Sequence, residues 1–489
     1  MQQTYVAVDI GASSGRLMLG QLNSNKLQLR EVHRFKNGFI KKGKFDCWSI
    51  DSIINEIFIG LEKVKGLGYK NIILGIDTWA VDYVLVGKNG KKLKDPISYR
   101  DSRTKNALKE LTSDLSKQYI YAKTGIQFLS FNTLYQLYEE SKDDLANTDK
   151  IMMIPDYIGY VLTGKAVTEI TNASTTQMLN LREGLFDDDL LKKVNVNQGQ
   201  FPKLVESGTV LGKIKDEWNQ KYDIPETTVV SVATHDTASA VLGAPGKGKH
   251  WAFISSGTWS LIGTELNVPE NGQKAFENNY TNEWGAYGTY RVLKNIMGLW
   301  MIQNVKKELS NDISFQDLAD LAAREKPFQQ FIDVNDKCFT NPENMIETIQ
   351  DYCKNTDQIV PTTGGELAMA IYSNLALYYA NEIQKLDGIL DYKLDSLNIV
   401  GGGSNIGLLN QLTSNLAHIN VLAGPSEATA IGNLVVQMIT KKEIRNISEG
   451  RNIISKSFKI KKFVPEDDNY DQVLENYQNF LNGEAITNI

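Results

Sequence analysis

The chain contains few of the side chains that build disulfide frameworks and metal sites. Among its 489 residues are only four histidines and three cysteines, Cys47, Cys338 and Cys353. An odd number of widely spaced cysteines argues against a disulfide framework and against a cysteine-bound zinc ion. No two histidines have the spacing that places metal ligands on one face of a helix. We therefore expect neither a disulfide-stapled protein nor a histidine-based metalloprotein.

Long apolar runs and long basic runs are also missing. No segment approaches the roughly 20 consecutive apolar residues that cross a bilayer, and no basic and then apolar leader opens the chain. The 52 lysines and arginines are outnumbered by 58 aspartates and glutamates, for a net charge of -6. Such a mixed surface does not suit a polyphosphate backbone. These absences predict a cytoplasmic protein that binds neither membrane nor nucleic acid; the oligomeric state stays open, with a monomer favoured.

The length predicts more than one domain, because a single hydrophobic core stops growing at about 250–300 residues. With 42% hydrophobic and 22% charged residues, the composition is that of an ordinary globular protein. The most glycine-rich linker, residues 243–249, indicates a boundary between domains at 1–244 and 251–440. Residues 441–489 then form a tail, and apolar residues at helical spacing near its end predict a helix that packs back on the body.

Each half of the chain opens with a strand, a polar turn and a returning strand, and continues with strands and helices. The first half has predicted strands at 5–8, 17–19 and 27–35, a helix from Ser49 and a strand at 72–76. The second half has predicted strands at 251–254, 259–262, 397–400 and 419–422, and helices at 366–386, 408–416 and 427–438. The shared order predicts a duplicated α/β architecture.

The first polar turn, residues 9–16, has the composition of an anion-binding loop. Gly11 and Gly15 allow backbone conformations closed to other residues, so N–H groups can converge on an anion, and Arg16 adds a cation. The turn leads into a strand and lacks Gly-Lys-Ser/Thr, which excludes a Walker loop and a dinucleotide fingerprint. We expect a hairpin that wraps phosphate oxygens, with Asp9 holding Mg²⁺ through water. The alternative is a plain tight hairpin with a solvated arginine.

A second turn of this kind, residues 255–258, favours the phosphate-binding interpretation, because two such hairpins can hold a triphosphate from both sides. Another apolar strand, beginning at Val229, delivers His235 and Asp236 to its carboxyl end, where ligands of open α/β sheets bind. Asp236 is placed to accept the proton of an attacking hydroxyl. The alternative is that Asp236 only caps the following helix.

Three further segments have a structural and a functional interpretation each. The glycines at 401–403 follow a strand and leave room for a nucleoside, but a strand-to-helix turn explains them equally well. Trp79, at the end of a buried strand and between carboxylates, suits a sugar or belongs to the core. The alternating charges at 99–103 are typical of a solvated surface network.

Seven segments together resemble the FGGY family of carbohydrate kinases. They are residues 6–16, 124–128, 131–135, 234–240, 255–260, 291–300 and 401–403. The resemblance covers nearly the whole chain, and the serine pair Ser13–Ser14 is specific to one branch of the family. It implies an α/β fold of two RNase H-like lobes of the actin-like ATPase type with an interlobe cleft. Sugar and phosphate would bind residues 1–244, and nucleotide would bind residues 251–440.

The implied activity is transfer of the γ-phosphoryl group of ATP to O1 of L-rhamnulose, with Mg²⁺ and with closure of the lobes to exclude water. Matched motif by motif, Asp236 resembles the catalytic base. The nucleotide contacts implied by the resemblance are Ala12, Ser13, Ser14, Gly15, Arg16, Thr258, Gln303 and Gly402. The implied sugar pocket consists of Ala80, His235, Thr237 and Asn295. Relatives often carry glycine at the position of Ala80, so its methyl group enters the expected pocket.

Three alternatives to this activity remain at the level of sequence. One is a sister kinase for another ketose or polyol, such as fuculose or xylulose. Another is an actin-like nucleotide switch without catalysis, which has no need of a base facing a sugar. The last is a nucleotide hydrolase of the same fold, which would consume ATP without an acceptor.

Overall fold

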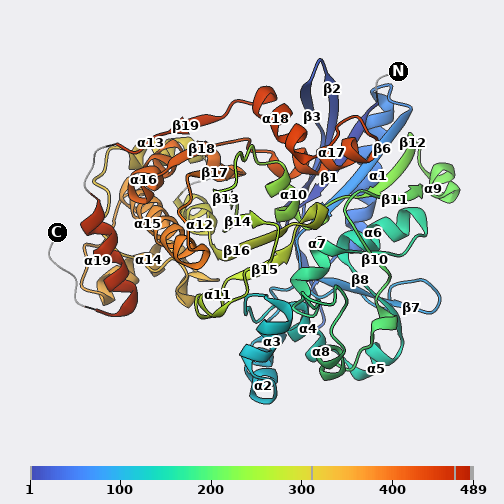
Figure 1. Cartoon of the computed structure of the whole chain (residues 1–489), viewed down its shortest axis with the longest axis horizontal. Helices are drawn as coiled ribbons and strands as arrows, with labels where there is room; N and C mark the ends of the chain where they lie inside the picture. The colour runs from blue at the N-terminus through green and yellow to red at the C-terminus, as the bar shows by residue number, and fades with distance from the viewer. Residues whose placement is uncertain (1–2, 310–311, 467–469, 485–489) are drawn as a thin grey trace. The chain divides into compact units, whose positions relative to one another are not determined.

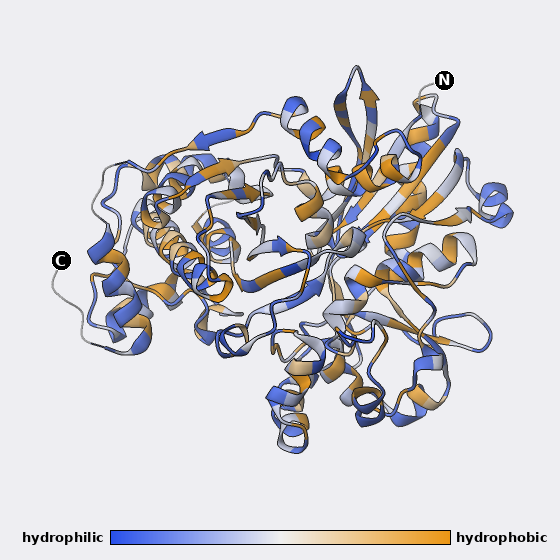
Figure 2. Cartoon of the chain, in the orientation of Figure 1, coloured by the Kyte–Doolittle hydropathy of each residue, from blue (hydrophilic) through white to orange (hydrophobic). Residues whose placement is uncertain are grey.

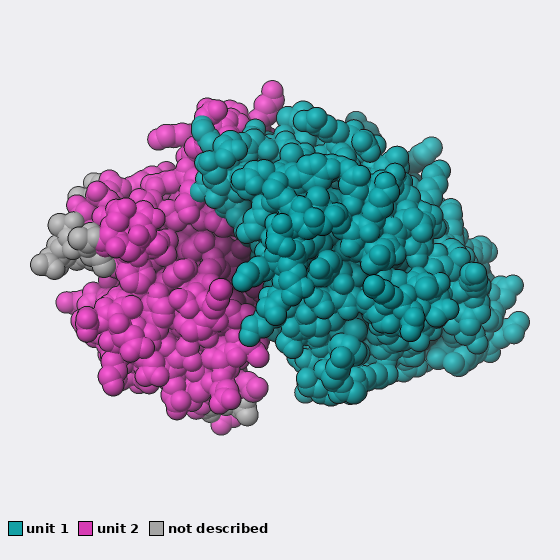
Figure 3. Space-filling model, turned by 90° about the horizontal axis from the view of Figure 1, so that it is seen from below, with its two compact units in different colours: residues 1–243, 265–292, 428–457 teal, residues 244–264, 293–427, 458–489 magenta. Residues whose placement is uncertain are grey.

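The computed structural model describes residues 3–309, 312–466 and 470–484 (Figure 1). The chain divides into two compact units, coloured separately in Figure 3. The first unit comprises residues 1–243, 265–292 and 428–457, and the second comprises residues 244–264, 293–427 and 458–489. Among the described residues, no helix combines the length and apolar character that crossing a membrane requires.

The first unit is built on a sheet whose strand order is β11-β12-β6-β1-β2-β3. These strands are β1 (Tyr5–Ile10), β2 (Ser14–Asn23), β3 (Lys26–Lys36), β6 (Asn71–Thr78), β11 (Thr209–Lys213) and β12 (Glu226–Ser231). Strand β1 runs antiparallel to β2 and parallel to β6, and β6 runs parallel to β12. All six residues of β1 are buried, as expected for a continuous apolar strand at the centre of a sheet.

Helices and smaller sheets complete the first unit. The helices are α1 (Ile50–Gly66), α2 (Ala107–Asp114), α3 (Lys117–Thr124), α4 (Thr133–Tyr138), α5 (Lys142–Ala146), α6 (Ile154–Thr163), α7 (Ile170–Ala173), α8 (Asp188–Lys193), α9 (Asp216–Lys221), α10 (Asp236–Leu242), α11 (Gln273–Glu277), α17 (Ala428–Thr440) and α18 (Ile447–Ser457). The strands of the smaller sheets are β4 (Phe39–Lys42), β5 (Phe45–Trp48), β7 (Tyr83–Gly87), β8 (Thr148–Met153), β9 (Thr168–Glu169) and β10 (Leu204–Val205). Strand β15 (Thr281–Trp284) is part of the seven-stranded sheet.

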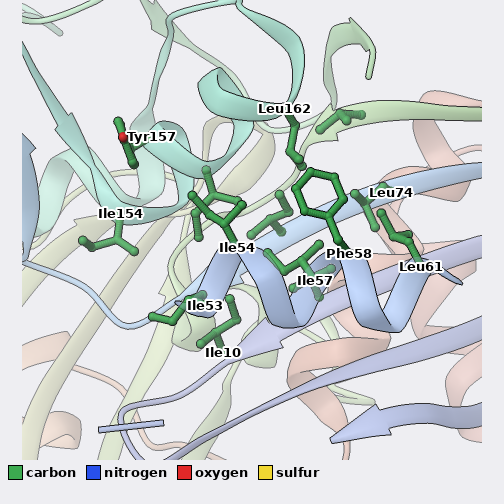
Figure 4. Packing of buried hydrophobic residues seen from close by; sticks show 14 of the residues in the cluster. Ile10, Ile53, Ile54, Ile57, Phe58, Leu61, Leu74, Ile154, Tyr157 and Leu162 are labelled. Carbon is green, nitrogen blue, oxygen red and sulfur yellow. The ribbon is translucent and has the colours of Figure 1, made fainter. Parts of the chain in front are cut away.

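Helix α1 shows how the apolar pattern becomes core. Its buried positions recur every three or four residues, and Ile54, Ile57 and Phe58 point toward residues of α6 and of the sheet (Figure 4). Figure 2 shows the same concentration of apolar residues on the central strands. The predicted helix from Ser49 is confirmed, with Ser49 at the N-cap.

The second unit repeats the arrangement of the first sheet with a different set of strands. Within its sheet the order β16-β14-β13-β17-β18-β19 joins β13 (Trp251–Ser256), β14 (Trp259–Leu266), β16 (Tyr290–Met297), β17 (Ser396–Val400), β18 (Asn420–Ala423) and β19 (Lys461–Phe463). Strand β13 runs antiparallel to β14 and parallel to β17, and β17 runs parallel to β18. In the first sheet β1 pairs with β2 and β6 in the same way, and β6 pairs with β12 as β17 does with β18. The predicted duplicated α/β architecture is therefore confirmed.

Helices α12 (Trp300–Leu309), α13 (Phe315–Ala322), α14 (Met345–Asn355), α15 (Gly364–Leu390), α16 (Gly407–Ala417) and α19 (Asp471–Asn482) belong to the second unit. The sequence places one division between residues 244 and 251, whereas the two units interleave along the chain. The reason is packing: α17 lies against α10 and β1, and the Gln437 side-chain amide donates to the carbonyl of Val6. In the tail, the hydroxyl of Tyr477 on α19 donates to the carbonyl of Ile332.

Candidate active site

The hairpin between β1 and β2 pairs Asp9 with Arg16. The two residues face each other in the strand register, and the Arg16 Nε and Nη2 groups donate to Asp9 Oδ2 over 3.1 and 2.7 Å. Asp9 is 7% exposed and Arg16 22% exposed. The alternative of a solvated arginine is therefore wrong: Arg16 is held against the carboxylate at the base of the turn.

Asn37 fixes the shape of this turn. Its backbone N–H donates to the carbonyl of Ser13 over 3.0 Å, and its side-chain amide donates to the carbonyl of Gly11 over 2.8 Å. Gly11 N–H also donates to the carbonyl of Ser14. Within the described residues, the N–H groups of Ala12 and Ser13 have no acceptor, so both are available to an anion. Nothing in the local sequence assigns Asn37 to the turn.

The glycines of the turn serve a different purpose from the expected one. Neither Gly11 nor Gly15 has a positive φ, so the expectation that both supply unusual backbone conformations is wrong. Gly15 pairs with Phe35 across the strands, and a Cβ atom there would lie 2.1 Å from the Phe35 ring. A Cβ atom at Gly11 would make only an ordinary contact at 3.6 Å. Gly15 is thus required by packing of the aromatic ring.

Three carboxylates lie at the same edge of the first sheet. Asp9 and Asp77 are partners in the parallel register of β1 and β6, and a bridge between Thr78 and His235 brings Asp236 to this edge. Burial and the nearby charge of Asp9 raise the pKa of Asp77 well above its usual value. Burial, followed by the charge of Asp9, also raises the pKa of Asp236, although His235 opposes the shift.

The same carboxylates fit the Mg²⁺ ion that the sequence predicts. Asp77 Oδ2 accepts a hydrogen bond from Asn433, but Asp77 Oδ1 is buried without a hydrogen-bond partner. A cation would satisfy this oxygen and relieve the repulsion between Asp77 and Asp9. Within the described residues, no group of three or more histidine, cysteine or acidic side chains could hold a metal alone. The site suits an ion that takes most of its ligands from water and phosphate.

Asp236 is the first residue of α10, and His235 occupies the N-cap position. The alternative that Asp236 only caps the helix is therefore wrong, because the cap lies one residue earlier, at His235. The Asp236 carboxylate is 31% exposed, and its Oδ1 accepts a hydrogen bond from the hydroxyl of the buried Thr237 over 3.2 Å. A partly exposed carboxylate with a raised pKa is able to accept a proton from a bound hydroxyl.

His235 joins Asp236 to a buried ion pair. Its Nε2 atom lies 3.4 Å from Asp236 Oδ1, and its Nδ1 atom lies 3.2 Å from Arg291 Nη1. Arg291 Nη2 in turn lies 3.0 Å from Glu283 Oε2. These three side chains behind Asp236 are nearly inaccessible to solvent, with exposures of 6% for His235 and Glu283 and 1% for Arg291.

The backbone next to Ala80 is strained and tightly held. Val81 has a φ of 65°, a conformation that costs a β-branched residue about 1–3 kcal/mol. Its N–H donates to Thr175 Oγ1 over 3.3 Å, and its carbonyl accepts from Thr133 Oγ1 over 2.6 Å and from Gln136 Nε2 over 3.3 Å. These three hydrogen bonds fix the position of the preceding Ala80 methyl group.

Two further expectations for the first unit are resolved by burial. Trp79 is 5% exposed, its ring centroid lies 4.3 Å from that of Trp48, and its Nε1 group donates to Asp82 Oδ2. It therefore belongs to the core and does not present its ring to a sugar. The prediction of a solvated surface network at 99–103 is wrong for Asp101. This residue is buried, and its carboxylate accepts a hydrogen bond from the backbone N–H of Arg103.

The second unit brings together two of the expected nucleotide contacts. Thr258, in the turn between β13 and β14, donates to the side chain of Gln303 on α12 over 3.3 Å. The turn itself is closed by the Gly257 N–H, which donates to the carbonyl of Trp259. Asn295 lies on β16 with a half-buried side chain.

The three consecutive glycines of the second unit have separate roles. Gly401 has a φ of 81°, and a Cβ atom at Gly403 would lie 2.1 Å from Ser256 Oγ. Both glycines therefore allow the 3-10 helix η6 (Gly402–Asn405) to approach β13 closely. Gly402 is exposed, and no protein atom lies closer than 3.7 Å to a Cβ atom there. Packing explains Gly401 and Gly403, and leaves Gly402 free for a ligand.

Comparison with known proteins assigns the chain to a family. Residues 4–243 match the N-terminal domain of the FGGY family of carbohydrate kinases, and residues 252–440 match the C-terminal domain of the same family. The chain belongs to the FGGY family. It is a carbohydrate kinase, and the alternative of a switch without catalysis is not supported.

Curated relatives of this FGGY kinase carry a more specific name. A rhamnulokinase from Ligilactobacillus salivarius (strain UCC118) is 68% identical over 482 residues, which cover 99% of both chains. A rhamnulokinase from Bacillus subtilis (strain 168) is 54% identical over 97% of this chain and 98% of the relative.

Solved structures confirm the predicted fold class of the kinase. A ligand-bound xylulose kinase from Lactobacillus acidophilus superposes with a TM-score of 0.81 at 18% identity, covering 98% of both chains. A glycerol kinase from Plasmodium falciparum with ADP gives a TM-score of 0.80 at 14% identity, covering 100% of this chain and 99% of the other. At these identities the likeness concerns the fold alone.

The structure separates the expected site residues of the kinase into two groups. Asp9, Ala12–Arg16, Ala80 and His235–Thr237 belong to the first unit, whereas Thr258, Asn295, Gln303 and Gly402 belong to the second. Sequence reasoning missed Asn37, Glu283 and the buried carboxylate of Asp77. For Asp77 a signal existed, because it ends a strand that could be expected to lie parallel to β1.

Proposed function

We propose that the protein transfers the γ-phosphoryl group of ATP to O1 of L-rhamnulose, forming L-rhamnulose 1-phosphate and ADP in L-rhamnose catabolism. The observation that carries the reaction type is the partly exposed Asp236 carboxylate beside the edge of the sheet where Asp9 and Asp77 meet. The choice of sugar is supported by relatives of 68% and 54% identity that are named rhamnulokinase.

In this proposal Asp236 takes the proton of the sugar hydroxyl as O1 bonds to the γ-phosphorus and the bond between that phosphorus and the departing ADP oxygen breaks. The free N–H groups of Ala12 and Ser13, with Ser14, Gly15 and Arg16, bind phosphate oxygens. Mg²⁺, when bound, neutralises the developing negative charge, and Asp9, through water, and Asp77 would hold it.

The remaining predicted contacts are part of the same proposal. Thr258, Gln303 and Gly402 bind the nucleotide, and Ala80, His235, Thr237 and Asn295 bind the sugar. We assign sugar and phosphate binding to residues 1–244, nucleotide binding to residues 251–440, and a packing role to the tail at 441–489. We also place the protein in the cytoplasm, where ATP is available.

A panel of ketoses tests the proposed substrate. The purified protein is given ATP, Mg²⁺ and either L-rhamnulose, L-fuculose or D-xylulose, and ADP release is followed by a coupled assay. We expect the highest kcat/KM for L-rhamnulose and negligible ADP release without a sugar. Equal values for all three ketoses would contradict the assignment to L-rhamnulose, and rapid ADP release without any acceptor would favour a hydrolase.

Ala80→Gly is expected to raise the KM for L-rhamnulose about fourfold, because one methyl contact contributes roughly 0.8 kcal/mol. The KM for ATP of the same variant serves as an internal control and should stay unchanged. Initial rates at varied concentrations of each substrate measure both constants. An unchanged KM for the sugar would remove Ala80 from the pocket.

A further inference from the structure

The buried ion pair of Glu283 and Arg291 lies behind the proposed base and has no part in the mechanism so far. Although burial opposes both charges, the positive charge of Arg291 holds the pKa of Glu283 below its usual value. Burial lowers the pKa of Arg291. Because the ordinary pKa of an arginine lies so far above neutral pH, the guanidinium group stays protonated. A buried pair of this kind contributes little net stability, because desolvation offsets the attraction. Its geometry indicates another role.

Arg291 determines which nitrogen of His235 can carry a proton. Its Nη1 and Nη2 groups approach His235 Nδ1 to 3.2 and 3.3 Å with hydrogen-bond geometry. A guanidinium group only donates, so Nδ1 must accept and the ring proton must lie on Nε2. Nε2 faces Asp236 Oδ1 at 3.4 Å. Glu283 Oε2 lies 3.2 Å from Nδ1 as well and 3.0 Å from Arg291 Nη2, where it balances the charge of the guanidinium.

This tautomer assigns different tasks to the two oxygens of Asp236. Oδ1 faces the Nε2 atom of His235 at 3.4 Å and accepts a hydrogen bond from the hydroxyl of Thr237. Among the described residues, Oδ2 has no hydrogen-bond partner and is left to the substrate. Arg291 is itself fixed, since Nη2 also donates to the carbonyl of Trp284 over 3.1 Å. The chain of contacts runs from Trp284 through Arg291 and His235 to Asp236.

We propose that Arg291, with Glu283 as its counter-ion, is a positioning residue that holds His235 in the Nε2-protonated tautomer and thereby turns Oδ2 of Asp236 toward the sugar hydroxyl. The inference rests on the proposed function, because the orientation of Asp236 matters only if this residue is the base of the kinase reaction. It concerns the tautomer of one histidine in the resting protein, which can be measured without turnover.

The first test is the nitrogen NMR spectrum of the wild-type protein with ¹⁵N-labelled histidine. The chain has only four histidines, and a His235→Asn variant identifies the signals of His235. At neutral pH we expect a protonated Nε2 and an unprotonated Nδ1. A proton on Nδ1, donated to Glu283, would overturn the proposal whatever the substrate of the enzyme is.

The second test separates positioning from folding. The double variant Glu283→Gln/Arg291→Met removes both charges of the ion pair together, so neither is left buried without its partner, and the melting temperature should stay close to that of the wild type. We expect kcat to fall about 10- to 100-fold, a part of what a general base contributes, with an unchanged KM for ATP. Arg291→Lys keeps one donor and should recover part of kcat.

Asp236→Asn is measured in parallel as a reference. A wild-type kcat in the double variant, together with an inactive Asp236→Asn, would overturn the positioning role and leave the proposed function intact. A wild-type kcat in Asp236→Asn would instead contradict the proposed base. A loss of kcat in the double variant that Arg291→Lys does not relieve at all would also contradict the role of the donated hydrogen bond.

Discussion

Asp236→Asn is expected to lower kcat by about 10²–10⁴-fold, the contribution typical of a general base. The amide has nearly the shape of the carboxylate but cannot accept the proton that leaves O1 when the phosphorus–oxygen bond forms. Because the substitution removes no bulk and Asp236 is already 31% exposed, the KM values for ATP and sugar should change little. Steady-state kinetics with the coupled ADP assay gives kcat and both KM values.

The matched control for this substitution is Asp223→Asn. Asp223 is 86% exposed and forms a surface ion pair with Lys65, an interaction worth at most about 1 kcal/mol. The control should retain the wild-type kcat, since neither residue lies near the carboxylates of the sheet edge. If Asp236→Asn retains that rate too, another group must accept the proton, and the proposed site loses its catalytic residue.

The sequence predicts the parts of this molecule that depend on local spacing. The apolar strand, polar turn and returning strand at residues 5–19 are visible from neighbouring residues, as is the helix after Ser49. The repetition of this order around residue 251 was enough to predict the duplicated architecture. Resemblance to the kinase family supplied the residues that we propose to contact the ligands, which no periodicity could assign.

Contacts between distant segments could not be predicted in this way. Arg291 meets His235 across 56 positions of the chain, and Asn37 reaches back to the carbonyl of Gly11. The reason for Gly15 lies in the ring of Phe35, a residue of the neighbouring strand. In each case the partner is fixed by strand register or by the crossing of elements, and the sequence alone does not give the register.

The helix cap at His235 shows that the sequence does not predict the first residue of a helix to within one position. A strand followed by an alanine-rich helix marks the junction, but the residue at which helical geometry begins depends on hydrogen bonds from other segments. Here Thr78 donates its N–H to the carbonyl of Thr234 and holds the chain extended up to His235. The shift by one residue leaves Asp236 free of a capping role.

Gly432→Ala is expected to destabilise the protein by about 2–3 kcal/mol, the upper part of the range for overpacking. Gly432 lies where α17 crosses α10, and a Cβ atom there would lie 1.8 Å from the carbonyl oxygen of Ser239. Gly243 faces the same crossing, with its Cβ position 2.0 Å from the carbonyl oxygen of Ala428. Because both near atoms belong to backbone, no side chain can move aside, and the helices must separate.

The matched control is Gly388→Ala in α15, where no atom lies within 4 Å of the added Cβ. That variant should gain about 1 kcal/mol from the higher helix propensity of alanine. Denaturant unfolding of both variants measures the difference. Since α10 begins with Asp236, separation of the helices at Gly432 should also displace the base and lower kcat, whereas Gly388→Ala should leave kcat unchanged. Equal stability and activity in the two variants would mean that the crossing of α10 and α17 does not set the position of Asp236.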